Sequence, residues 1–185
     1  MPLEYETRQD MVKSLNLQGH IVEIGVLQGD FAADILDLCP GVSLITLVDC
    51  WQPGALFASD QDGNNGKVYD NTANFIHVLE RFFNNKRAYI VKDSSEYFFQ
   101  RVADNSLDAV YITNLSDECI YNAYRTVKPG GWIMGWNYTT SSKCKTQLDF
   151  SAKQVVDEFC ATHNQSIHAL TLDGCVSYAI QKTLS

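Results

Sequence analysis

The sequence reads Val22-Glu23-Ile24-Gly25-Val26-Leu27-Gln28-Gly29-Asp30 where its first buried strand is expected to end. The apolar run before Gly25 is typical of a strand. Apolar residues recur at helical spacing after Asp30, which predicts a helix with Asp30 as its N-cap. Two glycines in such a turn let the backbone approach a ligand closely, and the start of the following helix is electropositive. The stretch therefore predicts a strand, turn and helix that bind a nucleotide-like ligand.

Short apolar runs alternate with longer amphipathic runs along the chain, a pattern typical of a parallel sheet covered by helices. The five expected strands span residues 20–24, 43–48, 88–91, 108–112 and 132–134. The expected helices begin near Asp30, Asn71, Ser94, Ser116 and Ser151. Two further strand-like runs flank Asp173-Gly174, which is a strong signal for a tight hairpin. The predicted fold class is α/β, a doubly wound and mainly parallel sheet with a C-terminal antiparallel hairpin.

Length and charge narrow the class of protein. The 185 residues fit one domain spanning 1–185. With 14 Lys+Arg against 22 Asp+Glu, the net charge of −8 repels phosphate backbones and anionic lipids, so neither nucleic acid nor a membrane is an expected partner. The six cysteines form no Cys-x-x-Cys pair and no basic and apolar leader precedes them, so we expect reduced thiols and a cytoplasmic location.

The second strand ends in Leu47-Val48-Asp49, where an acidic side chain can accept hydrogen bonds from both hydroxyls of a ribose. NAD-dependent enzymes also carry an acidic residue at about this distance from their glycine turn. However, the spacing of Gly25 and Gly29 is not Gly-x-Gly-x-x-Gly, and Gln28 stands where a further glycine would help to seat a pyrophosphate. The turn better suits the amino acid end of S-adenosylmethionine, and an NAD-dependent oxidoreductase or epimerase is the less favoured alternative.

The order of these segments resembles class I S-adenosylmethionine-dependent methyltransferases, and within them the small-molecule branch that includes macrocin O-methyltransferase-like enzymes. The resemblance rests on Glu23-Ile24-Gly25-Val26-Leu27-Gln28-Gly29-Asp30-Phe31, Val48-Asp49-Cys50-Trp51, Ser106-Leu107-Asp108-Ala109-Val110-Tyr111-Ile112, Val127-Lys128-Pro129-Gly130-Gly131-Trp132-Ile133-Met134-Gly135 and Val155-Val156-Asp157-Glu158-Phe159. It covers nearly the whole chain from His20 onward. It implies a seven-stranded sheet with one antiparallel strand near the edge, and S-adenosyl-L-methionine as the cofactor of a methyl transfer.

The resemblance also implies roles for single residues. Three of them, Glu23, Gly25 and Gly29, would line the methionine end of the cofactor. Asp49 would hold the ribose hydroxyls, and the next two residues, Cys50 and Trp51, would cover one side of the ribose or adenine. The segment after the third strand, Asp93, Ser94 and Ser95, would meet the adenine. Other roles stay open, because Asp49 and Asp93 could be helix caps and Trp51 could be part of the core.

The chain departs from the family after its fourth and fifth strands. Relatives commonly carry carboxylates there that hold a divalent metal, and a histidine that transfers a proton. Here Thr113 and Asn137 are neutral, whereas Mg²⁺ prefers anionic oxygen ligands, so we expect no metal. In the favoured reading Thr113, Asn137 and Tyr138 position a small polar substrate, and the acids Asp60 and Asp62 are the candidate bases.

The alternative is a cofactor-binding protein with little or no methyltransferase activity, which acts as a regulatory or partner subunit. In the first reading the expected partner is a small-molecule substrate. A homodimer is left open in both.

Overall fold

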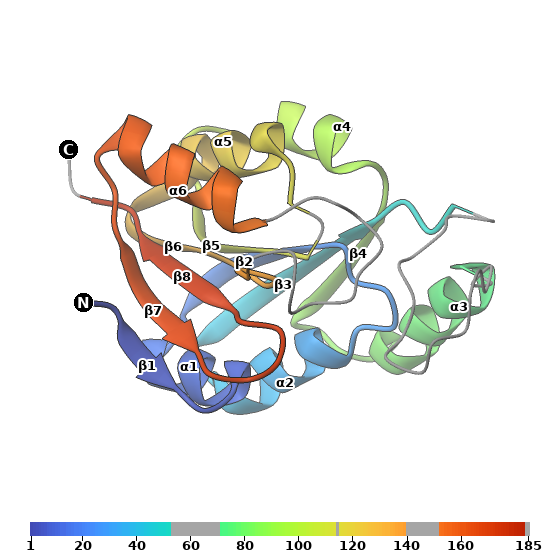
Figure 1. The fold of residues 1–185 in the computed structure, drawn as a ribbon. Coiled ribbons are helices and arrows are strands. Elements are labelled where there is room, and N and C mark those ends of the chain that lie inside the picture. The colour runs from blue at the N-terminus through green and yellow to red at the C-terminus, as the bar shows by residue number, and fades with distance from the viewer. Residues whose placement is uncertain (53–70, 114, 140–151, 184–185) are drawn as a thin grey trace, which may run out of the picture.

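The computed structural model describes residues 1–52, 71–113, 115–139 and 152–183. An eight-stranded sheet lies between two layers of helices (Figure 1). The strands are β1 (Leu3–Tyr5), β2 (Gly19–Ile24), β3 (Val42–Asp49), β4 (Ala88–Lys92), β5 (Leu107–Ile112), β6 (Val127–Gly135), β7 (Ile167–Thr171) and β8 (Tyr178–Gln181). The helices are α1 (Arg8–Leu15), α2 (Asp30–Leu38), α3 (Asn71–Phe82), α4 (Ser95–Gln100), α5 (Asp117–Thr126) and α6 (Ala152–His163).

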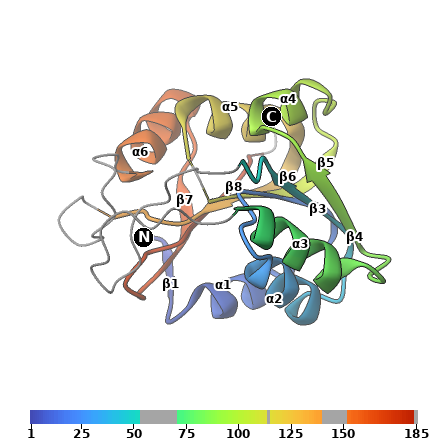
Figure 2. The same cartoon turned by 90° about the vertical axis from the view of Figure 1, so that its right-hand side faces the viewer.

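The strand order is β1-β7-β8-β6-β5-β2-β3-β4, and β8 alone of these strands runs antiparallel to its neighbours. The carboxyl ends of β2, β3, β5 and β6 therefore meet at one edge of the sheet. One buried core packs the sheet against α1, α2 and α3, and a second packs it against α4, α5 and α6. Figure 2 shows these two helix layers on opposite faces of the sheet.

The α/β class, the five parallel strands and the antiparallel C-terminal pair are confirmed. The expected number of seven strands is wrong, because Leu3–Tyr5 adds an eighth strand that pairs in parallel with β7. This short segment has no buried residue, so it lacks the apolar run that marks a strand in the sequence. Its conformation comes from hydrogen bonding to the edge of β7.

The start of α2 differs from the expectation by one residue. Gly29 occupies the N-cap with φ 75°, and Asp30 is the first helical residue, so Asp30 is not the cap. A left-handed conformation at this position favours glycine. Space favours it as well, since a Cβ on Gly29 would lie 2.7 Å from a ring carbon of Phe82. The turn is thus packed closely against α3.

The tight turn expected at Asp173-Gly174 is wrong, because β7 ends at Thr171 and β8 begins only at Tyr178. The Thr171 hydroxyl donates to Asp173 Oδ1 at 2.5 Å and accepts from the Ser177 backbone at 2.7 Å. These bonds stabilise a longer connection, which brings Ser177 next to the carboxyl end of β6.

Among the described residues, no helix combines the length and apolar character needed to cross a bilayer. The five cysteines in this part of the chain are free thiols, and Cys144 lies outside it.

Candidate functional site

The conformation of the glycine turn after β2 is fixed by its backbone dihedral angles and by hydrogen bonds to β3 and α3. Gly25 and Gly29 have φ values of 84° and 75°, and Leu27 between them also has a positive φ of 54°. The Gly25 N–H donates to Val48 O at 2.9 Å, which ties the turn to the end of β3. Gln28 Nε2 donates to Asn74 Oδ1 at 2.9 Å and so joins the turn to α3. The turn therefore has a fixed shape before any ligand binds.

Asp49 is buried at the carboxyl end of β3, directly across from this turn. Its Oδ2 accepts from the Leu27 N–H at 3.0 Å, and its Oδ1 accepts from the Trp51 N–H at 2.9 Å. Both bonds are to backbone outside a helix, so Asp49 is not a helix cap. The carboxylate fixes the turn and the exit of β3 together, and each of its oxygens retains a second lone pair.

Trp51 covers the turn from the side of α3. Its side chain is 1% exposed, its indole Nε1 donates to Leu27 O at 2.9 Å, and its ring lies 4.9 Å from that of Phe75. Trp51 is thus a core residue in this structure, and a role against a ribose or adenine stays a prediction. Cys50 is half-buried beside it.

Asp93 follows β4 and lies next to Asp49, since its N–H donates to Asp49 O at 3.0 Å. Its side chain accepts from the Ser94 N–H and forms a salt bridge with Arg101. The hydrogen bond from Arg101 lowers the pKa of Asp93. The N-cap of α4 is Ser94, and Ser95 is its first residue, so Asp93 supports the helix without capping it.

Glu23 lies at the carboxyl end of β2, on the face covered by α1 and α2, and is 2% exposed. Its Oε2 has no hydrogen-bond partner among the described residues. Burial raises the pKa of Glu23 to about 8; the charge of Arg8 opposes this shift, and Asp49, Asp30 and Asp34 add to it. A carboxyl group so placed suits a cationic partner.

Two buried hydroxyls, those of Tyr111 and Ser177, lie close to each other near Glu23. Tyr111 on β5 is the register partner of Glu23. Burial raises the pKa of Tyr111, whereas the charge of Arg8 and side-chain hydrogen bonds with Ser177 and Arg8 lower it. An unsatisfied buried polar atom is costly, so the Glu23 oxygen beside this polar cluster indicates a site that a polar ligand or water completes.

The three residues expected to position the substrate follow β5 and β6. Thr113 donates its N–H to Ile24 O at 2.8 Å, and its carbonyl accepts from Trp136 Nε1 at 2.6 Å. Asn137 has a φ of 64° and its side chain accepts from the Thr139 hydroxyl at 3.2 Å. Thr113 therefore lies beside the glycine turn, and Trp136 links the ends of β5 and β6.

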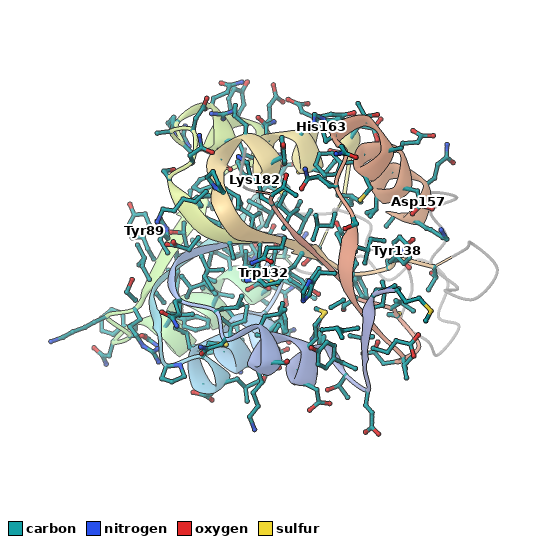
Figure 3. All side chains as sticks on the ribbon, turned by 90° about the vertical axis from the view of Figure 1, so that its left-hand side faces the viewer. Tyr89, Trp132, Tyr138, Asp157, His163 and Lys182 are labelled. Carbon is teal, nitrogen blue, oxygen red and sulfur yellow. The ribbon has the colours of Figure 1, made fainter. Side chains whose placement is uncertain are left out.

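Tyr138 is directed toward α6 (Figure 3). Its hydroxyl donates to Asp157 Oδ1 at 2.7 Å and accepts from Lys153 Nζ at 3.2 Å, while Lys153 and Asp157 also form a salt bridge. Burial, followed by the contact with Asp157, raises the pKa of Tyr138. In this structure the Tyr138 hydroxyl thus belongs to a contact between α6 and the segment after β6.

The structure brings Glu23, Gly25, Gly29, Asp49 and Thr113 to one edge of the sheet. Arg8, Tyr111 and Ser177 lie near Glu23 although the sequence did not predict them as site residues. The candidate bases Asp60 and Asp62 lie outside the described residues. Within those residues, no group of three or more His, Cys, Asp or Glu side chains is placed to hold a metal ion.

Searches for related proteins and structures gave different results. No family model matches the sequence, and no curated protein matches it. Among solved structures, the N-methyltransferase NodS from Bradyrhizobium japonicum WM9 superposes with a TM-score of 0.65 at 13% identity, covering 96% of this chain and 95% of NodS. An O-methyltransferase family protein from Burkholderia thailandensis gives a TM-score of 0.60 at 14% identity, covering 95% of this chain and 56% of that protein.

Spermidine synthase from Thermotoga maritima gives a TM-score of 0.58 at 14% identity, with 95% of this chain and 56% of the synthase covered. These three proteins are named for different acceptors and reactions, so the likeness does not select a substrate for this chain. At such low identity it shows the architecture alone. The chain has the Rossmann-like fold of class I methyltransferases.

Proposed function

We propose that this chain binds S-adenosylmethionine at the carboxyl edge of β2, β3 and β5 and transfers its methyl group to a small polar molecule without a divalent metal. The observation that carries the proposal is the buried Glu23 carboxyl, which has an oxygen without a described partner and lies two residues before the glycine turn begins at Gly25. An ammonium group would satisfy that oxygen, and the amino acid end of S-adenosylmethionine carries one.

The ribose end of the cofactor fits the same edge. Each oxygen of Asp49 accepts one backbone N–H and can accept one further hydrogen bond from a ribose hydroxyl. Gly25 and Gly29 have positive φ values and no Cβ, so the backbone of the turn can approach a ligand closely. Asp93, Ser94 and Ser95 lie one strand further along, and we propose that they meet the adenine.

S-adenosylmethionine supplies a methyl group on a positively charged sulfur. The protein must then hold an acceptor lone pair in line with the sulfur–methyl bond and keep water away. Thr113 lies next to the glycine turn, and Asn137 and Tyr138 follow the neighbouring strand, so we propose that these three residues orient a polar acceptor. The neutral side chains of Thr113 and Asn137 favour an acceptor that reacts without a metal ion.

Two measurements test the proposal. Isothermal titration calorimetry with S-adenosylmethionine up to millimolar concentration should show saturable binding to the full chain. Transfer of a labelled methyl group should then be detected on at least one member of a panel of phenols, sugars, amines and carboxylates. Absence of binding would contradict the proposal as a whole. Binding with no transfer to any class would favour the cofactor-binding subunit instead.

A further inference from the structure

Arg8 is a cation close to Glu23 and Tyr111, and its guanidinium forms a side-chain hydrogen bond with Tyr111. It is the first residue of α1, and its guanidinium carbon lies 4.4 Å from the centre of the Phe31 ring. The Phe31 ring in turn lies 4.4 Å from the ring of Tyr111. No described carboxylate forms a salt bridge with Arg8, although its charge is near enough to Glu23 to lower the pKa of that carboxyl.

The surroundings of Arg8 favour an anion. α1 begins at Arg8 itself, so the positive end of its helix dipole lies at this cluster. Tyr111 and Ser177 provide two buried hydroxyls, 1% exposed, which form a polar cluster with Arg8. Glu23 provides a carboxyl oxygen without a described partner, near enough to Arg8 to feel its charge. Together the four side chains offer a donor set for a carboxylate beside an acceptor for an ammonium.

We infer that Arg8, with the Tyr111 and Ser177 hydroxyls, binds the α-carboxylate of the cofactor's amino acid end, while Glu23 binds its ammonium. This inference rests on the proposed function. It assigns to a residue of α1, outside the glycine turn, the selection of an intact amino acid over a decarboxylated or shortened one. A guanidinium binds a carboxylate by directional, charge-assisted hydrogen bonds, which a ligand without that group cannot form.

The test compares two ligands that differ only in the carboxylate, S-adenosylmethionine and decarboxylated S-adenosylmethionine, by isothermal titration calorimetry of the full chain. Arg8→Met keeps the alkyl stem over Phe31 and removes the charge. We expect it to weaken binding of S-adenosylmethionine roughly ten-fold or more and to leave the decarboxylated ligand within about two-fold. Arg8→Lys should recover part of the loss. Glu23→Gln should weaken both ligands, because both carry the ammonium.

Lys13→Met removes a charge from the last turn of the same helix and is the matched control, and thermal melting verifies that each variant is folded. The inference would be overturned if Arg8→Met weakened the binding of both ligands equally, or of neither. Binding of S-adenosylmethionine to the wild-type chain would still support the proposed function in that case. Failure of the wild-type chain to bind either ligand would instead remove the proposed function itself. If Arg8→Met does not fold, Arg8→Lys and Tyr111→Phe provide the test. Both should weaken the binding of S-adenosylmethionine more than the binding of the decarboxylated ligand.

Discussion

The two ends of the candidate cofactor site are built in opposite ways. At the ribose end the carboxylates of Asp49 and Asp93 are both engaged by the chain itself, through backbone N–H groups and Arg101. At the amino acid end the buried Glu23 carboxyl keeps an oxygen without a described partner. The ribose end is therefore stabilised in the absence of ligand, whereas the amino acid end carries an energetic cost that a ligand can relieve.

The largest expected effect tests the cost at the amino acid end. The Glu23 carboxyl ionises near 4.5 in an unfolded chain and near 8 in the folded one. Between these values the unfolded chain releases a proton that the folded chain keeps, so the free energy of unfolding falls as the pH rises and levels off above 8. The wild-type chain should lose up to about 5 kcal/mol of its free energy of unfolding in this way, and Glu23→Gln should abolish that loss.

Urea denaturation of the ligand-free protein at several pH values between 4 and 9 measures the difference. Glu4→Gln, at an exposed position on β1, is the matched control. A constant stability difference between Glu23→Gln and wild type across this range would mean that Glu23 is not held neutral by burial, and the contrast between the two ends would fail.

A second prediction concerns Trp51 at the ribose end. Trp51→Ala should lower the free energy of unfolding by about 3 to 5 kcal/mol, because it empties a fully buried site against Phe75. Trp51→Phe keeps most of the packing and loses only the bond to Leu27 O, at a cost of about 1 kcal/mol. A loss below 1 kcal/mol for the alanine variant in chemical denaturation would indicate that Trp51 is free to contact a ligand.

Asp49 gives a third, smaller effect. Asp49→Ala should weaken the binding of S-adenosylmethionine by about 1.5 to 3 kcal/mol, because it removes the charged acceptors for the ribose and leaves the Leu27 N–H without its partner. Asp49→Asn keeps one acceptor oxygen and is the comparison variant. Calorimetric affinities that match wild type in both variants would leave Asp49 a purely structural residue.

The smallest expected effect is none at all. Methyl transfer on any acceptor found should continue at the same rate after treatment with EDTA, because the neutral side chains of Thr113 and Asn137 are poor Mg²⁺ ligands. An assay before and after chelation, with Mg²⁺ restored as the control, measures this. Strict dependence on Mg²⁺ would show that other acids supply the ligands.

Local patterns in the sequence predict most of the fold. The apolar runs of the five parallel strands and the cap Ser116 could be identified from neighbouring residues alone, whereas the cap of α4 is Ser94 and not the Asp93 that the sequence offered. By contrast, β1 and α1 could not, because Leu3–Tyr5 carries no apolar run and α1 has only two buried residues. Both elements depend on contacts with distant parts of the chain.

The residues of the candidate site also fall into those that local sequence predicts and those that depend on distant contacts. Asp49 and the glycine turn could be recognised because they lie within a few residues of a strand end. Tyr111 is polar in a strand whose other residues near its carboxyl end are buried and apolar, which was a usable signal. Tyr111 lies next to Glu23 only because β2 pairs with β5. Ser177 and Arg8 reach the same place through the positions of β8 and α1. The periodicity of the sequence indicates none of these arrangements.

The pairing of β1 with β7 has a practical consequence for work with this protein. Leu3–Tyr5 covers the outer edge of β7 and leads directly into Arg8. Deleting residues 1–6 would expose the backbone N–H and C=O groups of that edge, which can then pair with other chains and aggregate. The same deletion would release the first turn of α1, so a shortened protein that loses solubility and ligand affinity together would have one cause for both defects.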